Sequence, residues 1–321
     1  MSVLIFVEIA DGIVKNSSLE AVAYGARVAG LQNTTATALV IGNVSSDQLT
    51  ALGNFGAKKA LHANDPRLEH GVIQAYTSVL AQAMEKEGAT LLVLATSSLG
   101  SAVSARLAAR LKASLVTNAV DLPEVANGFR VKRSIYTGKA FAEVEMKGDQ
   151  KIIAIKKNAI TAEPTADQAD VETFVPTLSD ADFNVKITET VKATGDVLLP
   201  EADLVVSGGR GLKGPENWNL VEDLARALHA ATACSKPVSD LDWRPHHEHV
   251  GQTGIKISPN LYIAAGISGA IQHLAGVNSS KVIVVINKDP EAPFFKAADY
   301  GIVGDVFDIL PRLTKAVKEM A

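Results

Sequence analysis

Several features that are common in other protein classes are scarce in this 321-residue sequence. Cysteine occurs once, at Cys234, which excludes an intrachain disulfide framework and a CxxC pair. Aromatic residues make up only 5% of the chain, which favours compact α/β packing over an aromatic-rich sandwich. The formal net charge is −4, so no general electrostatic basis exists for binding nucleic acid or an anionic membrane. No apolar run approaches the ~20 residues that a membrane-spanning helix needs.

The start of the chain and its composition indicate a globular protein. Residues 1–10 read MSVLIFVEIA and run directly into an apolar segment, with no basic stretch before it. We therefore expect neither a secretory signal nor an organelle presequence, and we expect a prokaryotic cytoplasmic location. Hydrophobic residues make up 47% and charged residues 21%, an ordinary globular balance, and the length suits two domains.

Residues 1–194 are predicted to form a first α/β domain. Short apolar runs alternate with amphipathic segments, an order typical of a parallel sheet with right-handed crossovers. Strands are predicted at residues 3–9, 35–41, 59–63 and 90–95, and helices near residues 19–29, 46–55, 72–87 and 101–112. Two later runs, 129–136 and 140–146, alternate more strongly, and together with residues 151–157 they predict antiparallel strands added to this domain.

A polar stretch leads into a second predicted domain, residues 195–321. Residues 161–177 are rich in Ala, Asp, Thr and Pro and predict an exposed connector, and residues 183–190 predict one more strand. In the second domain, strands are predicted at residues 204–206, 231–234, 261–265, 281–287 and 300–303, and helices at 217–230, 269–275 and 306–320. Both domains are thus expected to be mainly parallel sheets flanked by helices.

Residues 261–287 predict a strand, a tight glycine turn, a helix and a second strand. Both apolar runs lack alternation, which is typical of parallel strands that are buried on both faces. Ser268 is expected to cap the helix at residues 269–275. This unit directs backbone N–H groups toward the carboxyl edge of the sheet, where an anion binds favourably. His273 shares a helical face with Gly269, so it either reaches a group held at the turn or packs against a loop.

Polar residues of the second domain gather directly after the predicted strands. Because the carboxyl ends of parallel strands share one edge, these residues are expected to line a common pocket. Two cations, Gly-rich turns at 208–211 and 266–269 and one carboxylate favour a nucleotide-like ligand. Taken singly, Arg210 is equally well explained by a surface ion pair and Asn287 by a loop contact, and Asp305 is better explained by a helix cap. Ser268 could likewise be a cap, and Lys236 a solvated loop cation. The full set is Arg210, Ser235, Lys236, Ser268, Asn287 and Asp305.

Two other motifs give weaker signals. Residues 246–249 read His-His-Glu-His, but the spacing fits neither HExxH nor an i,i+4 pair, so a solvated loop is predicted rather than a metal site. Residues 96–100 lack a GxGxxG or P-loop pattern, and helix capping explains them better. No Ser/His/Asp or Cys/His set is placed for nucleophilic catalysis.

Sequence motifs in the second domain resemble a known family. LYIAAGISGAIQHLAG, from residue 261, and KVIVVINKDPEAPFFKAADYGIVGD, from residue 281, closely resemble the signature of the electron transfer flavoprotein alpha subunit. VVSGGRGLKGPENW and VGQTG, from residues 205 and 250, fit the same family. The first domain resembles it more loosely, through VKRSIYTGKA at residues 131–140.

The resemblance implies a heterodimeric electron carrier with no substrate chemistry of its own. One FAD would bind to a Rossmann-like second domain, and the first domain would contact a beta subunit that also holds an AMP. Electrons would come from dehydrogenases, such as the acyl-CoA dehydrogenases of fatty acid beta-oxidation, and pass to a membrane quinone oxidoreductase. An electron-bifurcating variant stays open. The alternatives are an NAD- or CoA-binding oxidoreductase with His273 as its base, and a ligand-free scaffold subunit.

The resemblance also implies roles for individual residues. Thr253 and Gln252 would lie near the isoalloxazine ring with Arg210, and His273 would approach the pyrimidine O2. Where the family usually has Ser-Arg this chain has Ser-Lys, and Lys236 keeps the charge but loses the planar guanidinium, which puts the flavin potentials in question. The other FAD-binding residues implied are Ser235, Val250, Gly251, Ser268, Gly269, Ala270, Ile271 and Gln272, with Asn287 and Asp305 at the adenosine part.

Overall fold

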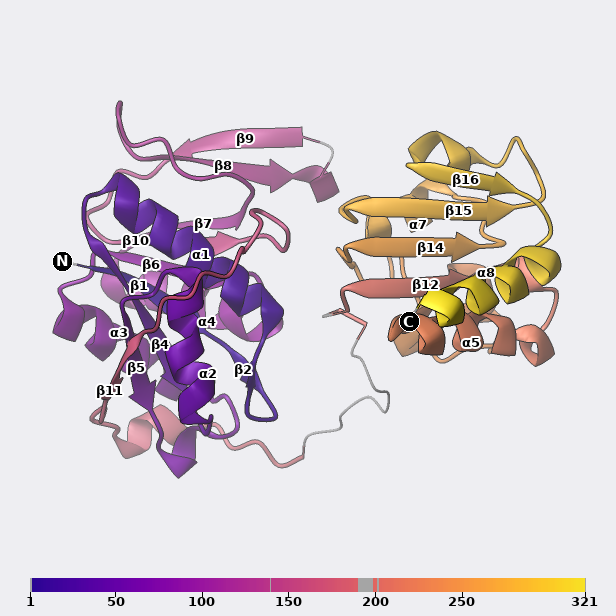
Figure 1. Cartoon of the computed structure of the whole chain (residues 1–321). Helices are drawn as coiled ribbons and strands as arrows, with labels where there is room; N and C mark the ends of the chain where they lie inside the picture. The colour runs from indigo at the N-terminus through magenta and orange to yellow at the C-terminus, as the bar shows by residue number, and fades with distance from the viewer. Residues whose placement is uncertain (1, 139, 190–198, 201, 321) are drawn as a thin grey trace. The chain divides into compact units, whose positions relative to one another are not determined.

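The computed structural model describes residues 2–320 apart from residues 139, 190–198 and 201. The chain divides into two compact units, residues 1–190 and 191–321, and each is built on its own large sheet (Figure 1). The predicted domain boundary between residues 194 and 195 lies outside the described residues. The predicted fold class, α/β with mainly parallel sheets, is confirmed.

The N-terminal unit contains a nine-stranded sheet in the order β11-β5-β4-β1-β6-β10-β7-β8-β9. All neighbouring strands are parallel except β7, β8 and β9, which pair antiparallel. The strands are β1 (Ser2–Val7), β4 (Thr35–Ile41), β5 (Lys59–Ala63), β6 (Leu91–Ala95), β7 (Ser114–Ala119), β8 (Arg130–Ile135), β9 (Ala140–Glu145), β10 (Lys151–Ile155) and β11 (Asp170–Thr173), and β2 (Ile9–Ala10) and β3 (Ile13–Val14) form a separate hairpin.

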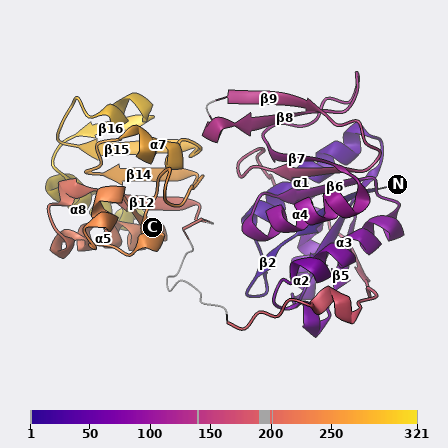
Figure 2. The ribbon, with the colours of Figure 1, turned by 180° about the vertical axis from the view of Figure 1, so that it is seen from behind.

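Helices cover both faces of this sheet, because its central strands are apolar on both sides. Every residue of β1 is buried, and two separate apolar clusters lie on its two faces. Figures 1 and 2 show α1 on one face and α3 and α4 on the other. The helices are α1 (Asn16–Leu31), α2 (Ser46–Thr50), α3 (Ile73–Glu87) and α4 (Ser98–Leu111).

Tertiary pairing overturns part of the predicted strand set in this unit. The run predicted as a third antiparallel strand, β10, is parallel and lies between β6 and β7. Its four residues Ile152 to Ile155 are fully buried, which is typical of a central strand in a parallel sheet. Strand β7 was not predicted, because SLVTNA mixes polar and apolar residues without a clear period.

The predicted connector at residues 161–177 contains an edge strand. β11 pairs in parallel with β5, although three of its four residues are exposed, which explains its polar composition. The strand predicted at residues 183–190 is wrong for the residues described, since Asp180–Phe183 form a 3-10 helix and 184–189 contain no strand.

The C-terminal unit contains an all-parallel, five-stranded sheet in the order β13-β12-β14-β15-β16. Helices α5 and α8 pack over one apolar cluster of this sheet and α7 over another; Figure 2 shows α7 from the opposite side. The strands are β12 (Leu204–Gly208), β13 (Ala231–Cys234), β14 (Leu261–Ala265), β15 (Val282–Asn287) and β16 (Tyr300–Val303), and the helices are α5 (Asn219–Leu228), α6 (Lys236–Asp240), α7 (Ile271–Val277) and α8 (Val306–Met320).

The helix after the glycine turn begins two residues later than predicted, and Ser268 does not cap it. Ala270 occupies the N-cap position of α7, without a side-chain cap. The Ser268 carbonyl instead accepts a hydrogen bond from the Phe294 N–H, at 3.1 Å. Gly269 is needed at this contact, because it has φ +83° and a Cβ there would lie 2.5 Å from the Phe294 Cα. The turn is therefore shaped by the segment after β15.

Candidate functional site

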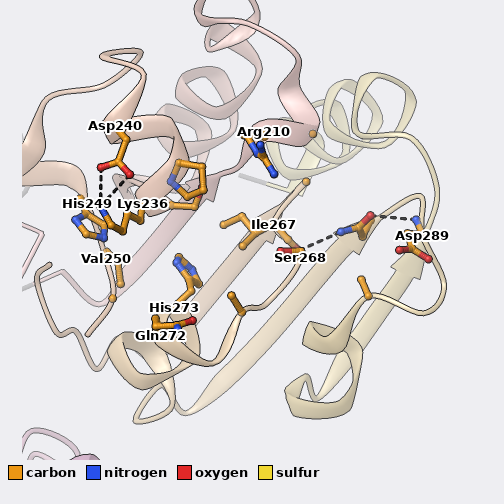
Figure 3. A pocket seen from close by; sticks show the side chains of 18 of the residues that line it. Arg210, Lys236, Asp240, His249, Val250, Ile267, Ser268, Gln272, His273 and Asp289 are labelled. Atoms are coloured by element: carbon orange, nitrogen blue, oxygen red, sulfur yellow. Dashed lines mark hydrogen bonds and ion pairs between the residues drawn. The ribbon is translucent and has the colours of Figure 1, made fainter. Parts of the chain in front are cut away.

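A cavity of about 810 Å³ lies at the carboxyl edge of the C-terminal sheet. Segments that follow all five strands contribute to its wall, together with residues 249–253 (Figure 3). Its volume falls within the range of about 300–1,000 Å³ that is usual for small-molecule sites. Of the residues proposed from the sequence, those that line the cavity are Arg210, Ser235, Lys236, Val250, Gly251, Gln252, Thr253, Ser268, Ala270, Gln272, His273, Asn287 and Asp305.

Two proposed residues, Gly269 and Ile271, do not line the cavity. Gly269 is buried against Phe294, and the Ile271 side chain is 64% exposed on α7. They were proposed because they lie next to cavity residues in the sequence. Successive residues at a helix N-terminus point toward different sides, so only some of them face the cavity.

Glycines bring the ends of β12 and β14 into direct backbone contact on the cavity wall. The Gly211 N–H donates a hydrogen bond to the Gly266 carbonyl at 3.0 Å. A Cβ at Gly211 would lie 2.6 Å from the Gly266 Cα, and Gly266 itself has φ +65°. Any side chain at either position would therefore separate the two turns and narrow the cavity.

Positive side chains on the cavity wall are held in different ways. Lys236 Nζ forms an ion pair with Asp240, at 2.7 and 2.8 Å from its two oxygens (Figure 3). Lys213 Nζ lies 4.6 Å from the centre of the Phe307 ring. Arg210 is exposed and forms no ion pair with any residue that the structure describes, so the surface ion pair considered for it is not found there. Arg210 is therefore available to an anionic ligand.

Asn287 and Asp305 already serve the protein backbone. Asn287 donates to the Ile267 carbonyl at 3.0 Å and accepts from the Asp289 N–H at 3.0 Å, which joins the segments after β14 and β15. Asp305 Oδ1 accepts from the Phe307 N–H at 3.1 Å at the start of α8. The loop contact and the helix cap considered for these residues are therefore both present. If either residue also binds a ligand, it does so in addition to these structural hydrogen bonds.

His273 is a buried imidazole on the cavity wall, only 6% exposed. Its Nε2 lies 2.8 Å from the hydroxyl of Tyr262, and its Nδ1 is buried without a hydrogen-bond partner among the described residues. Burial lowers the pKa of His273 to about 4, the nearby His249 adds to this effect, and the Val250 carbonyl weakly opposes it. The ring is therefore neutral at pH 7.

The second cavity histidine, His249, was missed because residues 246–249 were predicted to be a solvated loop. That prediction is wrong for Glu248 and His249, which are 7% and 2% exposed. Arg244 folds the loop inward by ion pairs with Glu248 at 2.6 Å and Glu222 at 2.9 Å. Burial, with the charges of His246 and Lys236, lowers the pKa of His249. The sequence pattern gives no signal for this burial, because it depends on Arg244 reaching Glu248 and Glu222.

The cavity offers binding groups rather than a nucleophile. Cys234 ends the strand beside it, but burial raises the pKa of this thiol to about 12, so it stays protonated. In the part of the chain that the structure describes, no group of three or more His, Cys, Asp or Glu side chains is placed to hold a metal ion. Among the same residues, no helix is long and apolar enough to cross a bilayer.

The fold and the cavity define an open α/β protein of the class that binds ligands at the carboxyl edge of a parallel sheet. Two family profiles match the chain, the electron transfer flavoprotein domain over residues 3–179 and the electron transfer flavoprotein FAD-binding domain over residues 198–278. The chain belongs to the electron transfer flavoprotein alpha-subunit family.

Relatives match along nearly the whole chain. The electron transfer flavoprotein subunit alpha of Bacillus subtilis is 39% identical over 321 residues, covering 99% of this chain and 98% of that protein. Its counterpart in Mycobacterium leprae is 38% identical over 319 residues, covering 98% of each. Protein FixB of Clostridium saccharobutylicum is 34% identical over 323 residues, covering 99% of this chain and 96% of that protein.

Proposed function

We propose that this chain is the alpha subunit of a heterodimeric electron transfer flavoprotein and that its C-terminal cavity binds FAD. One observation carries the proposal: a single cavity at a parallel-sheet edge collects close-packed glycines, an arginine without an ion pair and a buried imidazole whose Nδ1 has no hydrogen-bond partner, both judged among the described residues. This combination suits a ligand that has both a diphosphate and a polar ring system.

The residues present fit a flavin dinucleotide. The contact between Gly211 and Gly266 holds the turns after β12 and β14 together on the cavity wall, and Arg210 supplies positive charge near the isoalloxazine ring. Gln252 and Thr253, both exposed on the wall, offer amide and hydroxyl groups to the ring. The orphaned Nδ1 of His273 is a buried polar atom that native proteins usually satisfy.

Bound FAD would supply the electron-transfer chemistry, while the chain binds and orients it and keeps water from one side of it. The competing role of His273, as the base of an NAD- or CoA-dependent enzyme, gains no support. A pKa of about 4 makes it a weak base, and Nε2 already contacts Tyr262. The family relationship favours a carrier over a substrate enzyme.

The partners are part of the same proposal. We infer that a beta subunit binds this chain and holds an AMP, and that the N-terminal unit contributes to the contact. Dehydrogenases, such as acyl-CoA dehydrogenases, would deliver electrons, and a membrane quinone oxidoreductase would accept them. The names of the relatives, which denote one subunit of an electron carrier, support this arrangement.

Co-expression with the cognate beta subunit tests the proposal. The purified complex is expected to be yellow and to release one FAD per heterodimer on denaturation. Arg210→Ala is expected to weaken FAD binding about tenfold or more, the loss of a charge-assisted hydrogen bond. Arg226→Ala is the matched control, because Arg226 lies on α5 outside the cavity and pairs with Asp223.

Two results would count against the proposal. A colourless complex that takes up no FAD would favour the scaffold alternative. Equal FAD affinity in the Arg210 and Arg226 variants would place the cofactor elsewhere. Reduction of the complex by an acyl-CoA dehydrogenase with its substrate tests the donor. Reduction by NADH would favour an oxidoreductase or a bifurcating variant.

A further inference from the structure

Tyr262 and His273 form a buried pair in which His273 lines the cavity and Tyr262 lies behind it. Tyr262 lies in the middle strand of the sheet, β14, and is fully buried, and His273 lies on α7, which packs over it. The phenolic oxygen and His273 Nε2 are 2.8 Å apart. Phe294 contacts both rings, with centroid distances of 6.3 Å to Tyr262 and 5.7 Å to His273. The two polar atoms are therefore held together by packing from a third segment.

The direction of this hydrogen bond follows from the number of partners. A phenol has one proton to donate, and a buried donor without an acceptor is costly. His273 Nε2 is the acceptor within hydrogen-bond distance of the Tyr262 hydroxyl. Burial raises the pKa of Tyr262, so the phenol keeps its proton, and the nearby buried Ser207 hydroxyl lowers that pKa in part, as a donor to the phenol oxygen does. Tyr262 therefore donates, and Nε2 accepts.

We propose that Tyr262 is a positioning residue that fixes His273 as the neutral tautomer with its ring proton on Nδ1. The Val250 carbonyl agrees with this assignment, because it can only accept a hydrogen bond from the imidazole while Nε2 is occupied by Tyr262. The titratable group that faces His273 from the neighbouring loop is His249, whose charge disfavours a second cation. His273, which lines the cavity, is thus a neutral imidazole with its proton on Nδ1.

The assignment of the tautomer stands on the fold alone, whereas its effect on FAD rests on the proposed function. Tyr262→Phe removes the hydroxyl group that donates to Nε2 and stabilises this nitrogen in its unprotonated form. The imidazole then gains the freedom to carry its proton on Nε2 or to become a cation. The pKa of His273 is therefore expected to rise in this variant, and its tautomer to change.

Nitrogen-15 NMR of the histidine-labelled full chain tests the assignment. His273 is identified among the seven histidines by its loss in His273→Asn. We expect the Nδ1–H tautomer in the wild type, with no titration between pH 8 and 5, and a changed tautomer and a higher pKa in Tyr262→Phe. Tyr76→Phe is the matched control, because it removes another buried phenol hydroxyl, bonded to the Leu68 carbonyl at 2.9 Å, in the other unit.

An Nε2–H tautomer in the wild type, or an unchanged His273 signal in Tyr262→Phe, would overturn the proposal. In the FAD-loaded complex, Tyr262→Phe is expected to raise the midpoint potential of the flavin at pH 6, and Tyr76→Phe to leave it unchanged. If the complex binds no FAD, the proposed function fails while the NMR result still decides the tautomer. If FAD binds with an unchanged potential, the link from Tyr262 to the cofactor fails alone.

Discussion

Acid should destabilise the C-terminal unit through His273. The pKa of this imidazole falls from the usual 6.5 to about 4 because the ring is buried. A lowered pKa means that the unfolded chain binds more protons than the native one between these two values. The stability that His273 contributes is therefore present above about pH 6.5 and is lost as the pH falls toward 4.

The size of the effect follows from the two pKa values. The shift from 6.5 to about 4, at 1.36 kcal/mol per pKa unit, corresponds to about 3 kcal/mol at low pH. Integration between pH 7 and pH 5 gives a loss of about 2 kcal/mol in the free energy of unfolding. This is a large fraction of the roughly 5–15 kcal/mol that stabilises a typical domain.

Urea unfolding of the full chain, without added FAD, measures this loss. Tryptophan fluorescence reports on the C-terminal unit, because both tryptophans, Trp218 and Trp243, lie there. Between pH 7 and 5 the wild type should lose about 2 kcal/mol more than His273→Asn. His229→Asn is the control, since this exposed residue ends α5 with φ +51°, a conformation that asparagine tolerates. Equal pH dependence in the wild type and in His273→Asn would refute the reasoning.

Three further predictions concern other contacts. Gly269→Ala should destabilise the C-terminal unit by about 1–3 kcal/mol, because Gly269 has a positive φ and an added Cβ would clash with the Phe294 backbone. The control is Gly30→Ala, which should be tolerated because its Cβ would meet open space. Equal melting temperatures of the two variants would contradict this prediction. Arg244→Leu should lower the free energy of unfolding by about 1–3 kcal/mol in the same urea assay, because it leaves the buried Glu248 carboxylate unpaired. An unchanged free energy of unfolding would contradict a structural role for the Arg244–Glu248 ion pair. Lys236→Arg should stabilise the one-electron reduced state of the loaded complex, because a planar guanidinium spreads its charge over more donors; a spectroelectrochemical titration with unchanged potentials would argue against it.

Much of the architecture was predictable because the parallel strands are apolar on both faces. Helix α8 and strands β13, β14 and β16 lie at the predicted residues, since their periodicity and flanking turns agree. The errors on β10 and β11 share one physical cause. The pairing partners of β10 and β11 lie far away in the chain, and a strand's direction and neighbours are set by contacts that local pattern does not encode.

The candidate site was likewise predictable only in part from the sequence. Strand ends of a parallel sheet must share an edge, so the residues that follow them can be grouped from the order of the strands along the chain. The burial of His249 cannot be predicted in this way, because it depends on Arg244 reaching both Glu248 and Glu222. The ion pair that joins Lys236 to Asp240 differs, because these residues lie four positions apart in α6, a spacing that the sequence shows.

The sequence by itself determined two things about this protein: its sheet-and-helix class and the set of polar residues at one sheet edge. Both follow from short-range rules, the period of apolar residues and the glycines that end strands. Only the tertiary structure decided the burial, the hydrogen-bond partners and the protonation state of each group. Burial against Tyr262 and Phe294 makes His273 a neutral ring, because solvation and hydrogen-bond partners come from segments distant in sequence.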